Sequence, residues 1–226
     1  MSKKSIEIRK KPYSLLAISY SPFASGTARG FTLIELLLAI SLLSFLIGLL
    51  WVIGQDASEA AMVENQRQII LDETGRTEGD ITRYIQEAAR VATSYTDPTT
   101  GEVSLTSPNS LVLELVSYDQ SGIRLSGVMD RVVIKPDPEI PSTLIIQTIP
   151  GMGSRRANQT RRPLTTLANL DFHYFLPGDT ETTDPGAFSS VTRIQVNLDA
   201  QVTVKNRTVS ANFVGGGKLR NHQVEN

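Results

Sequence analysis

One segment of this sequence constrains the fold more than any other, an apolar run at residues 31–54. It contains a single ionisable residue, Glu35, within about 24 residues. A helix of that length crosses the roughly 30 Å hydrocarbon core of a bilayer. The remainder of the chain is polar enough for a water-soluble domain, so the sequence predicts one membrane-spanning helix joined to a soluble part.

Charge changes sign across this apolar run. Residues 1–30 hold six of the 22 Lys and Arg residues and one of the 23 Asp and Glu residues, which leaves 16 basic and 22 acidic residues beyond Gly30 and a formal charge of about −6 there. Basic residues beside a span favour the cytoplasmic side. The sequence therefore predicts a single-pass protein of the inner (cytoplasmic) membrane, with a cytoplasmic N-terminus and an extracytoplasmic C-terminal domain.

Several kinds of chemistry lack the residues they need. There is no cysteine, which removes thiol catalysis, iron–sulfur clusters and cysteine zinc sites. The two histidines, His173 and His222, lie far apart in the sequence, and no motif of a hydrolase, a zinc peptidase or a P-loop occurs. We therefore expect a protein that is not an enzyme and has no cofactor and no metal site.

A secretory signal peptide is the alternative interpretation of the first 55 residues. Such a signal has an apolar stretch of about 7 to 15 residues followed by a small-residue cleavage motif. Here the stretch is long enough to span, and no such motif borders it at residues 50–55. Gly30 instead lies before the run, directly after Arg29, so a cut there would leave the apolar helix on the mature protein.

Glu35 places a carboxylate one turn into the apolar run, at a cost of about 3 kcal/mol. If the chain were cut after Gly30, Phe31 would carry a new α-amino group four residues from this carboxylate. That cation could neutralise Glu35 within one chain or between neighbouring chains, and the helix dipole favours a carboxylate near a helix N-terminus. Gly30, Phe31 and Glu35 are therefore the candidate site residues.

The segment Gly-Phe-Thr-Leu-Ile-Glu at residues 30–35, with a basic leader before it and an apolar run after it, resembles the processing and methylation motif of type IV prepilins and type II secretion pseudopilins. The resemblance implies that a prepilin peptidase/methyltransferase cuts after Gly30 and methylates Phe31, and that Glu35 is needed for assembly. It also implies membrane lipid as the first environment of the helix. The later partners would be other pilin or pseudopilin subunits and an inner-membrane assembly platform, in a pilus or pseudopilus.

Two further segments bear on the kind of subunit. Residues 80–91 resemble a segment of larger minor pilins, and residues 167–175 resemble a strand of the J-type minor pseudopilins and W-type minor pilins. The absence of a cysteine pair also favours a minor subunit over a major type IV pilin. The alternative function is a bitopic membrane-anchored binding domain that never polymerises, and it predicts an uncut leader.

The domain organisation follows from the pattern of apolar residues. We expect a leader at 1–30, a transmembrane or filament-core helix at 31–54, and an extracytoplasmic helical segment at 55–97 whose glycines leave a break at 74–80 open. A β-rich head at 98–214 and a flexible tail at 215–226 would follow. The predicted fold is α+β and pilin-like, with the long N-terminal helix packed on an antiparallel sheet. The expected strands are 111–118, 122–125, 131–134, 142–149, 167–175, 191–198 and 200–213.

Two charged clusters in the head were weighed as binding sites. One is a basic cluster that could bind phosphate, but no aromatic residue interleaves with its arginines, so a solvated loop is favoured and DNA is not an expected partner. The other is an acidic loop without the residue order of a known calcium loop. The residues of the two clusters are Arg155, Arg156, Arg161 and Arg162, and Asp179, Glu181 and Asp184.

Overall fold

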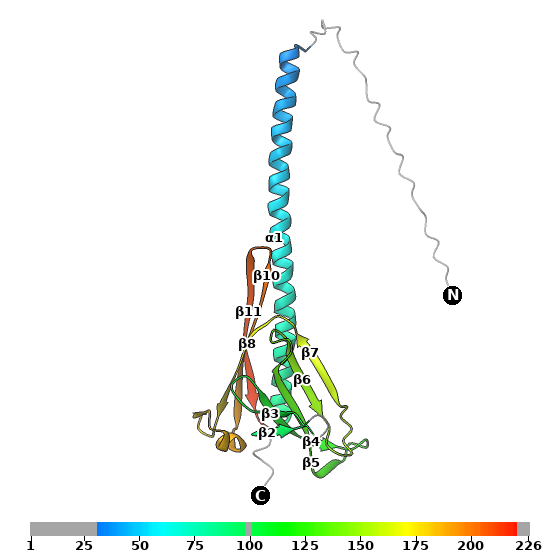
Figure 1. Cartoon of the computed structure of the whole chain (residues 1–226), viewed down its shortest axis with the longest axis vertical. Helices are drawn as coiled ribbons and strands as arrows, with labels where there is room; N and C mark the ends of the chain where they lie inside the picture. Colours follow the sequence, from blue (N-terminus) through cyan, green and yellow to red (C-terminus); the bar gives the residue numbers. More distant parts are fainter. Residues whose placement is uncertain (1–30, 98–100, 221–226) are drawn as a thin grey trace, which may run out of the picture. The chain divides into compact units, whose positions relative to one another are not determined.

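The computed structural model describes residues 31–97 and 101–220 (Figure 1). The chain divides into two compact units, Met1–Val52 and Ile53–Asn226. Helix α1 (Leu33–Glu87) contributes residues 33–52 to the first unit and residues 53–87 to the second. The leader at residues 1–30, including Gly30, lies outside the described residues.

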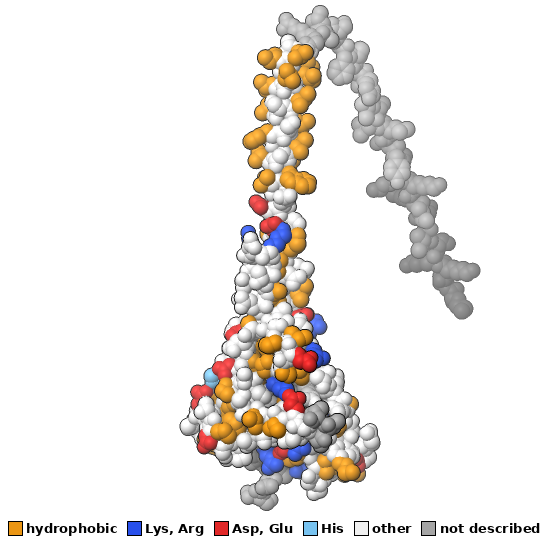
Figure 2. All heavy atoms as spheres, viewed as in Figure 1, with side chains coloured by type: hydrophobic (Ala, Val, Ile, Leu, Met, Phe, Trp, Pro, Cys, Tyr) orange, Lys and Arg blue, Asp and Glu red, His pale blue; other side chains and the backbone are white. Residues whose placement is uncertain are grey.

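In the first unit, no described residue packs against the apolar side chains of α1. From Leu33 to Val52 the large hydrophobic side chains are 44–76% exposed. Figure 2 shows hydrophobic side chains gathered along this part of the helix. Its two serines donate hydrogen bonds to carbonyls of the same helix, Ser41 Oγ to Leu38 O at 2.9 Å and Ser44 Oγ to Ile40 O at 2.8 Å. These hydroxyls are satisfied within the segment, as a lipid environment requires.

The second unit places two antiparallel sheets against the rest of α1. One sheet has the order β1-β4-β5-β6-β7 and the other β11-β10-β8-β9, and a separate hairpin pairs β2 with β3. The expected α+β, pilin-like architecture is confirmed. The strands are β1 (Ala88–Val91), β2 (Ser94–Thr96), β3 (Val103–Leu105), β4 (Leu111–Tyr118), β5 (Arg124–Pro136), β6 (Leu144–Ile149), β7 (Gln159–Leu164), β8 (Leu167–Phe175), β9 (Glu181–Thr182), β10 (Arg193–Val204) and β11 (Arg207–Lys218), with the 3₁₀ helix η1 (Pro185–Ser190) before β10.

A stripe along the later part of α1 fills the core between the two sheets. Side chains from both sheets join this stripe in one hydrophobic cluster. Spacings of three and four residues place the stripe on one helical face, which is why the helix can bury it. The buried helical residues are Ile70, Thr74, Thr77, Ile81, Tyr84 and Ile85.

The helix continues through residues 74–80, where the sequence had left a break open. The hydroxyls of buried Thr74 and Thr77 donate hydrogen bonds to the helix carbonyls of Ile70 and Glu73, and the Thr77 hydroxyl also lies 3.3 Å from Pro163 O. Packing on the sheets therefore offsets the low helix propensity of the glycines, which amounts to about 1 kcal/mol each.

The helix ends earlier than the sequence predicted. Residues 88–91 fall within the helical segment predicted at 55–97, but they form β1, which pairs antiparallel with β4. Buried Ala88 and Val91 are three residues apart, a spacing that does not distinguish the two structures by itself. The strand is fixed from outside the segment, because Arg90 pairs with the buried carboxylate of Glu114 at 2.6 Å, and Arg131 reaches the same carboxylate at 3.2 Å.

Two of the expected strands, 111–118 and 167–175, coincide with β4 and β8. The segments 122–125 and 131–134 fall largely in a single long strand, β5, and the hairpin expected after residue 198 turns later, at residues 205–206 between β10 and β11. Four short strands were missed, β2, β3, β7 and β9.

The assignment of residues 215–226 to a flexible tail was wrong for residues 215–218, which belong to β11. Gly215 and Gly217 let this strand approach α1 closely, because a methyl group on Gly215 would overlap the Glu78 side chain and one on Gly217 would lie 3.0 Å from Gln86. Gly216, whose φ is +136°, is instead close to β10, where a methyl group would overlap the Ile194 carbonyl oxygen. The Gly216 N–H donates to Thr82 Oγ1 at 3.2 Å. Glycine serves here as a packing residue.

Candidate functional site

The candidate site begins where α1 begins. Thr32 and Glu35 form a reciprocal cap at the N-terminus of the helix. The Thr32 N–H and hydroxyl both donate to Glu35 Oε2 at 2.9 Å, and the Glu35 N–H donates to Thr32 Oγ1 at 3.3 Å. This is the capping-box arrangement, in which each residue satisfies an amide that the first helical turn leaves unpaired.

The cap gives Glu35 a partner that the sequence analysis missed. The motif at residues 30–35 includes Thr32 but gives it no role of its own. Thr-x-x-Glu before an apolar run is nevertheless the sequence pattern of a capping box. The carboxylate is thus hydrogen-bonded within one chain, without any amine from Phe31. Both Thr32 donors use Oε2, and no donor from residues 31–97 or 101–220 binds Oε1.

The other two candidate residues are placed differently. Phe31 is outside the helix and 87% exposed, two residues before the first helical residue, Leu33. Gly30 lies outside the described residues, so the bond between Gly30 and Phe31 has no described geometry. Of the three predicted site residues, the structure therefore places two at the N-terminus of α1, Phe31 just before the helix and Glu35 in its first turn.

The surface after the cap is apolar over the full length that a bilayer needs. The helix is long and apolar enough to cross a membrane, and none of the apolar stretch is buried within the chain. Together with the motif described below, this helix fits anchoring in an inner membrane.

Comparison with known proteins finds a match for this part of the chain. Residues 26–51 match the family model of the prokaryotic N-terminal methylation motif. No curated protein matches the chain. The matched residues include all three candidate residues, Gly30, Phe31 and Glu35, and the cap residue Thr32.

These observations define a class of protein. The chain carries a prepilin-type N-terminal motif on a long apolar helix, followed by antiparallel sheets. It is thus a pilin-like chain, consistent with a type IV pilin or pseudopilin and with a role of that kind.

The four arginines of the basic cluster have different partners in the structure. Three of its arginines pair with carboxylates: Arg156 with Glu87 and Asp130 at 3.0 Å each, Arg161 with Asp80 at 2.6 Å, and Arg162 with Asp137 at 3.0 Å. Arg155 instead lies over the ring of Tyr118, with 5.6 Å from its guanidinium carbon to the ring centre. An aromatic partner thus comes from β4, where sequence proximity could not reveal it.

The three acidic residues of the loop also have different partners. Asp179 pairs with Arg193 at 3.1 Å, Asp184 accepts from the Gly186 N–H at 2.9 Å, and Glu181 contacts His173 Nδ1 at 2.6 Å. Within residues 31–97 and 101–220, no group of three or more His, Asp or Glu side chains could hold a metal ion.

Proposed function

We propose that this chain is a structural minor subunit of a type IV pilus or type II secretion pseudopilus, cut after Gly30, methylated on Phe31 and assembled through α1. The exposed apolar part of α1, residues 33–52, carries the proposal, because its side chains have no partner within the described chain. Lipid would cover this surface before assembly, and the same helices of neighbouring subunits would cover it in the filament.

Glu35 has two separable roles in this proposal. Through Thr32 it caps the helix, and this needs only a hydrogen-bond acceptor. Through its charge it would pair with the α-amino group that cleavage creates on Phe31, in its own chain or in a neighbour. A charge pair of that kind in a low-dielectric surrounding would help to set the register of subunits, because an uncompensated charge there is costly.

The processing step is tested by mass spectrometry of the protein isolated from its host. We expect a mature N-terminus at Phe31 carrying one added methyl group. A start at any other residue contradicts the cleavage site, and an intact leader favours the alternative function, a bitopic membrane-anchored binding domain that does not polymerise.

The two roles of Glu35 are separated by a pair of variants. Glu35→Gln keeps an acceptor for the cap but removes the charge, since glutamine also serves in capping boxes. Thr32→Ala removes the two cap hydrogen bonds that the Thr32 hydroxyl makes and keeps the charge of Glu35. We expect both proteins to insert into the membrane, and we expect Glu35→Gln alone to lose incorporation into filaments, measured by shearing and immunoblotting. Normal incorporation of Glu35→Gln would contradict a role for its charge.

A further inference from the structure

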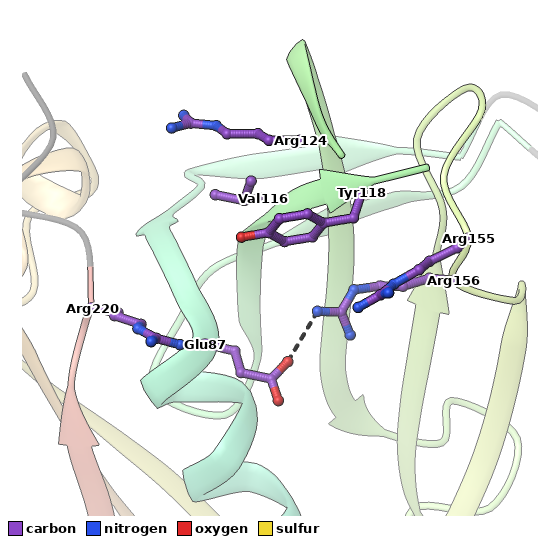
Figure 3. A pocket seen from close by; sticks show the side chains of 7 residues that line it. All are labelled: Glu87, Val116, Tyr118, Arg124, Arg155, Arg156 and Arg220. Atoms are coloured by element: carbon purple, nitrogen blue, oxygen red, sulfur yellow. Dashed lines mark hydrogen bonds and ion pairs between the residues drawn. The ribbon is translucent and has the colours of Figure 1, made fainter. Parts of the chain in front are cut away.

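An arginine-lined cavity of about 710 Å³ lies in the second unit (Figure 3). The end of α1, strands β4 and β5, the loop between β6 and β7, and the chain after β11 supply its walls. In Figure 3 the Tyr118 hydroxyl is directed toward the space that these side chains enclose. The lining residues are Glu87, Val116, Tyr118, Arg124, Arg155, Arg156 and Arg220.

The arginines of this cavity differ in how they are neutralised. Arg156 bonds to Glu87 and to Asp130, and Asp130 is fully buried and also accepts from Ser117, Ser154 and the Gly151 N–H. This network fixes the loop that carries Arg155 and Arg156.

The remaining three arginines, Arg124, Arg155 and Arg220, form no ion pair with a carboxylate of residues 31–97 or 101–220. Nearby Asp119 is held within its own turn by the N–H groups of Ser121 and Ile123. Asp119 keeps its negative charge in that turn, so the four guanidinium groups and the three carboxylates of Glu87, Asp130 and Asp119 leave an excess of one positive charge. Lys218, which lines a neighbouring hollow together with Glu87 and Arg220, raises the excess to two.

We propose that this cavity binds a phosphate monoester, with the phosphate held by the arginines and the organic part beside Tyr118. A phosphate monoester carries a charge of about −1.5 to −2 at neutral pH, which matches this excess of positive charge. Guanidinium groups bind phosphate oxygens in paired hydrogen bonds. A single carboxylate supplies half of that charge and fewer acceptors.

The size of the cavity and its aromatic wall favour a phosphate ester over free phosphate as the ligand. The volume lies within the range of about 300–1,000 Å³ that is typical of small-molecule sites. Tyr118 is 37% exposed, and Arg155 lies over its ring. A sugar or base can therefore lie against a side chain whose position is already fixed. The site is distinct from the helix start and does not depend on filament assembly.

Isothermal titration calorimetry of the full chain in nonionic detergent tests the proposal. The probes are AMP and glucose 6-phosphate, with adenosine, glucose, inorganic phosphate and citrate for comparison. We expect both esters to bind, the neutral compounds not to bind, and affinity to fall with added salt because surface charge is screened. Arg124→Gln and Arg155→Gln should each weaken binding about tenfold, since each removes a charged hydrogen bond.

Arg207→Gln is the matched control, because Arg207 is exposed on β11 and does not line this cavity. It removes the same charge and should leave affinity unchanged, and urea unfolding checks that all three variants fold. Equal weakening by Arg207→Gln, or no binding of either ester, would overturn the proposal. Inorganic phosphate bound as tightly as the esters would overturn the ester assignment, and tighter binding of citrate would overturn the choice of phosphate.

Discussion

The two parts of α1 are both helical but differ in where their partners lie. From Leu33 to Val52 the large apolar side chains are exposed, whereas from Ile70 to Ile85 one stripe is buried against two sheets. Secondary structure is therefore the same in both parts, and among the described residues only the second part has packing partners. The comparison teaches that the first part is built for partners from outside, either lipid or other helices.

The largest expected effect concerns the strand that lies against the buried part of the helix. Gly216→Val places a β-branched side chain at a φ of +136° and against the Ile194 carbonyl. We expect the second unit to lose its folded state, because neither the backbone strain nor the clash can be relieved locally. Circular dichroism during urea unfolding measures this effect.

Gly79→Ala is the control for that variant, since a methyl group there meets nothing within 4 Å. It should stabilise the helix by roughly 1 kcal/mol. A folded Gly216→Val protein of normal stability would show that neither the positive φ of Gly216 nor its close contact with β10 is needed by the sheet that packs on this part of α1.

A smaller effect is expected from truncating the buried stripe. Ile81 is fully buried, so Ile81→Ala should lower the free energy of unfolding by about 3 kcal/mol. Leu43 is 58% exposed, so Leu43→Ala should leave that free energy unchanged. Tyrosine fluorescence of the second unit during urea unfolding follows both variants. Equal losses would remove the distinction between the two parts of the helix.

The second unit is also held by charged groups, which predicts a pH dependence. The N–H of Glu139 and the guanidinium of Arg162 hold the pKa of Asp137 below its ordinary value, because both favour the ionised carboxylate. The stabilisation is therefore present above the unfolded-state pKa of about 3.9 and is lost as pH falls through the lower folded-state pKa.

Asp137→Asn removes this contribution. We expect the variant to be less stable than the parent protein at pH 6, with the difference shrinking as pH falls below about 4. Urea midpoints at pH 6 and at several pH values below about 4 measure it, and the exposed Asp56→Asn serves as control. A constant difference at all pH values would rule out ionisation as the cause.

The smallest effect is expected where the β10–β11 turn meets α1. Lys205 forms an ion pair with Glu59. The hydrogen bond from Lys205, and after it the positive charge of Lys205, lowers the pKa of Glu59. Both side chains are exposed, so Lys205→Gln should lower the urea midpoint only slightly, and the loss should vanish at about 1 M salt. A loss that persists at high salt would indicate packing of the turn as its cause.

Local sequence patterns predicted the elements whose structure is decided locally. The apolar helix, strands β4 and β8 and the antiparallel head all follow from period and composition. The end of α1 did not, because Arg90 is fixed by a carboxylate 24 residues away. The triple glycine was read as flexible because its partners, Thr82 and Gln86, lie more than 100 residues earlier.

The functional residues also differ in whether the local sequence reveals them. Glu35 could be recognised from its isolation in an apolar run, and its Thr32 partner from the capping pattern. The arginine cavity could not, because Tyr118, Arg155 and Arg220 come from separate elements that only the fold brings together.

The Thr32–Glu35 cap has a consequence for the order of events in the life of the chain. The first hydrogen bond of the helix joins the Leu36 N–H to the Thr32 carbonyl, and the Glu35 N–H is occupied by Thr32 Oγ1. Neither bond uses an atom that precedes Thr32. These two bonds therefore do not depend on the leader, and cleavage after Gly30 would leave both in place while it changes the charge at the start of α1.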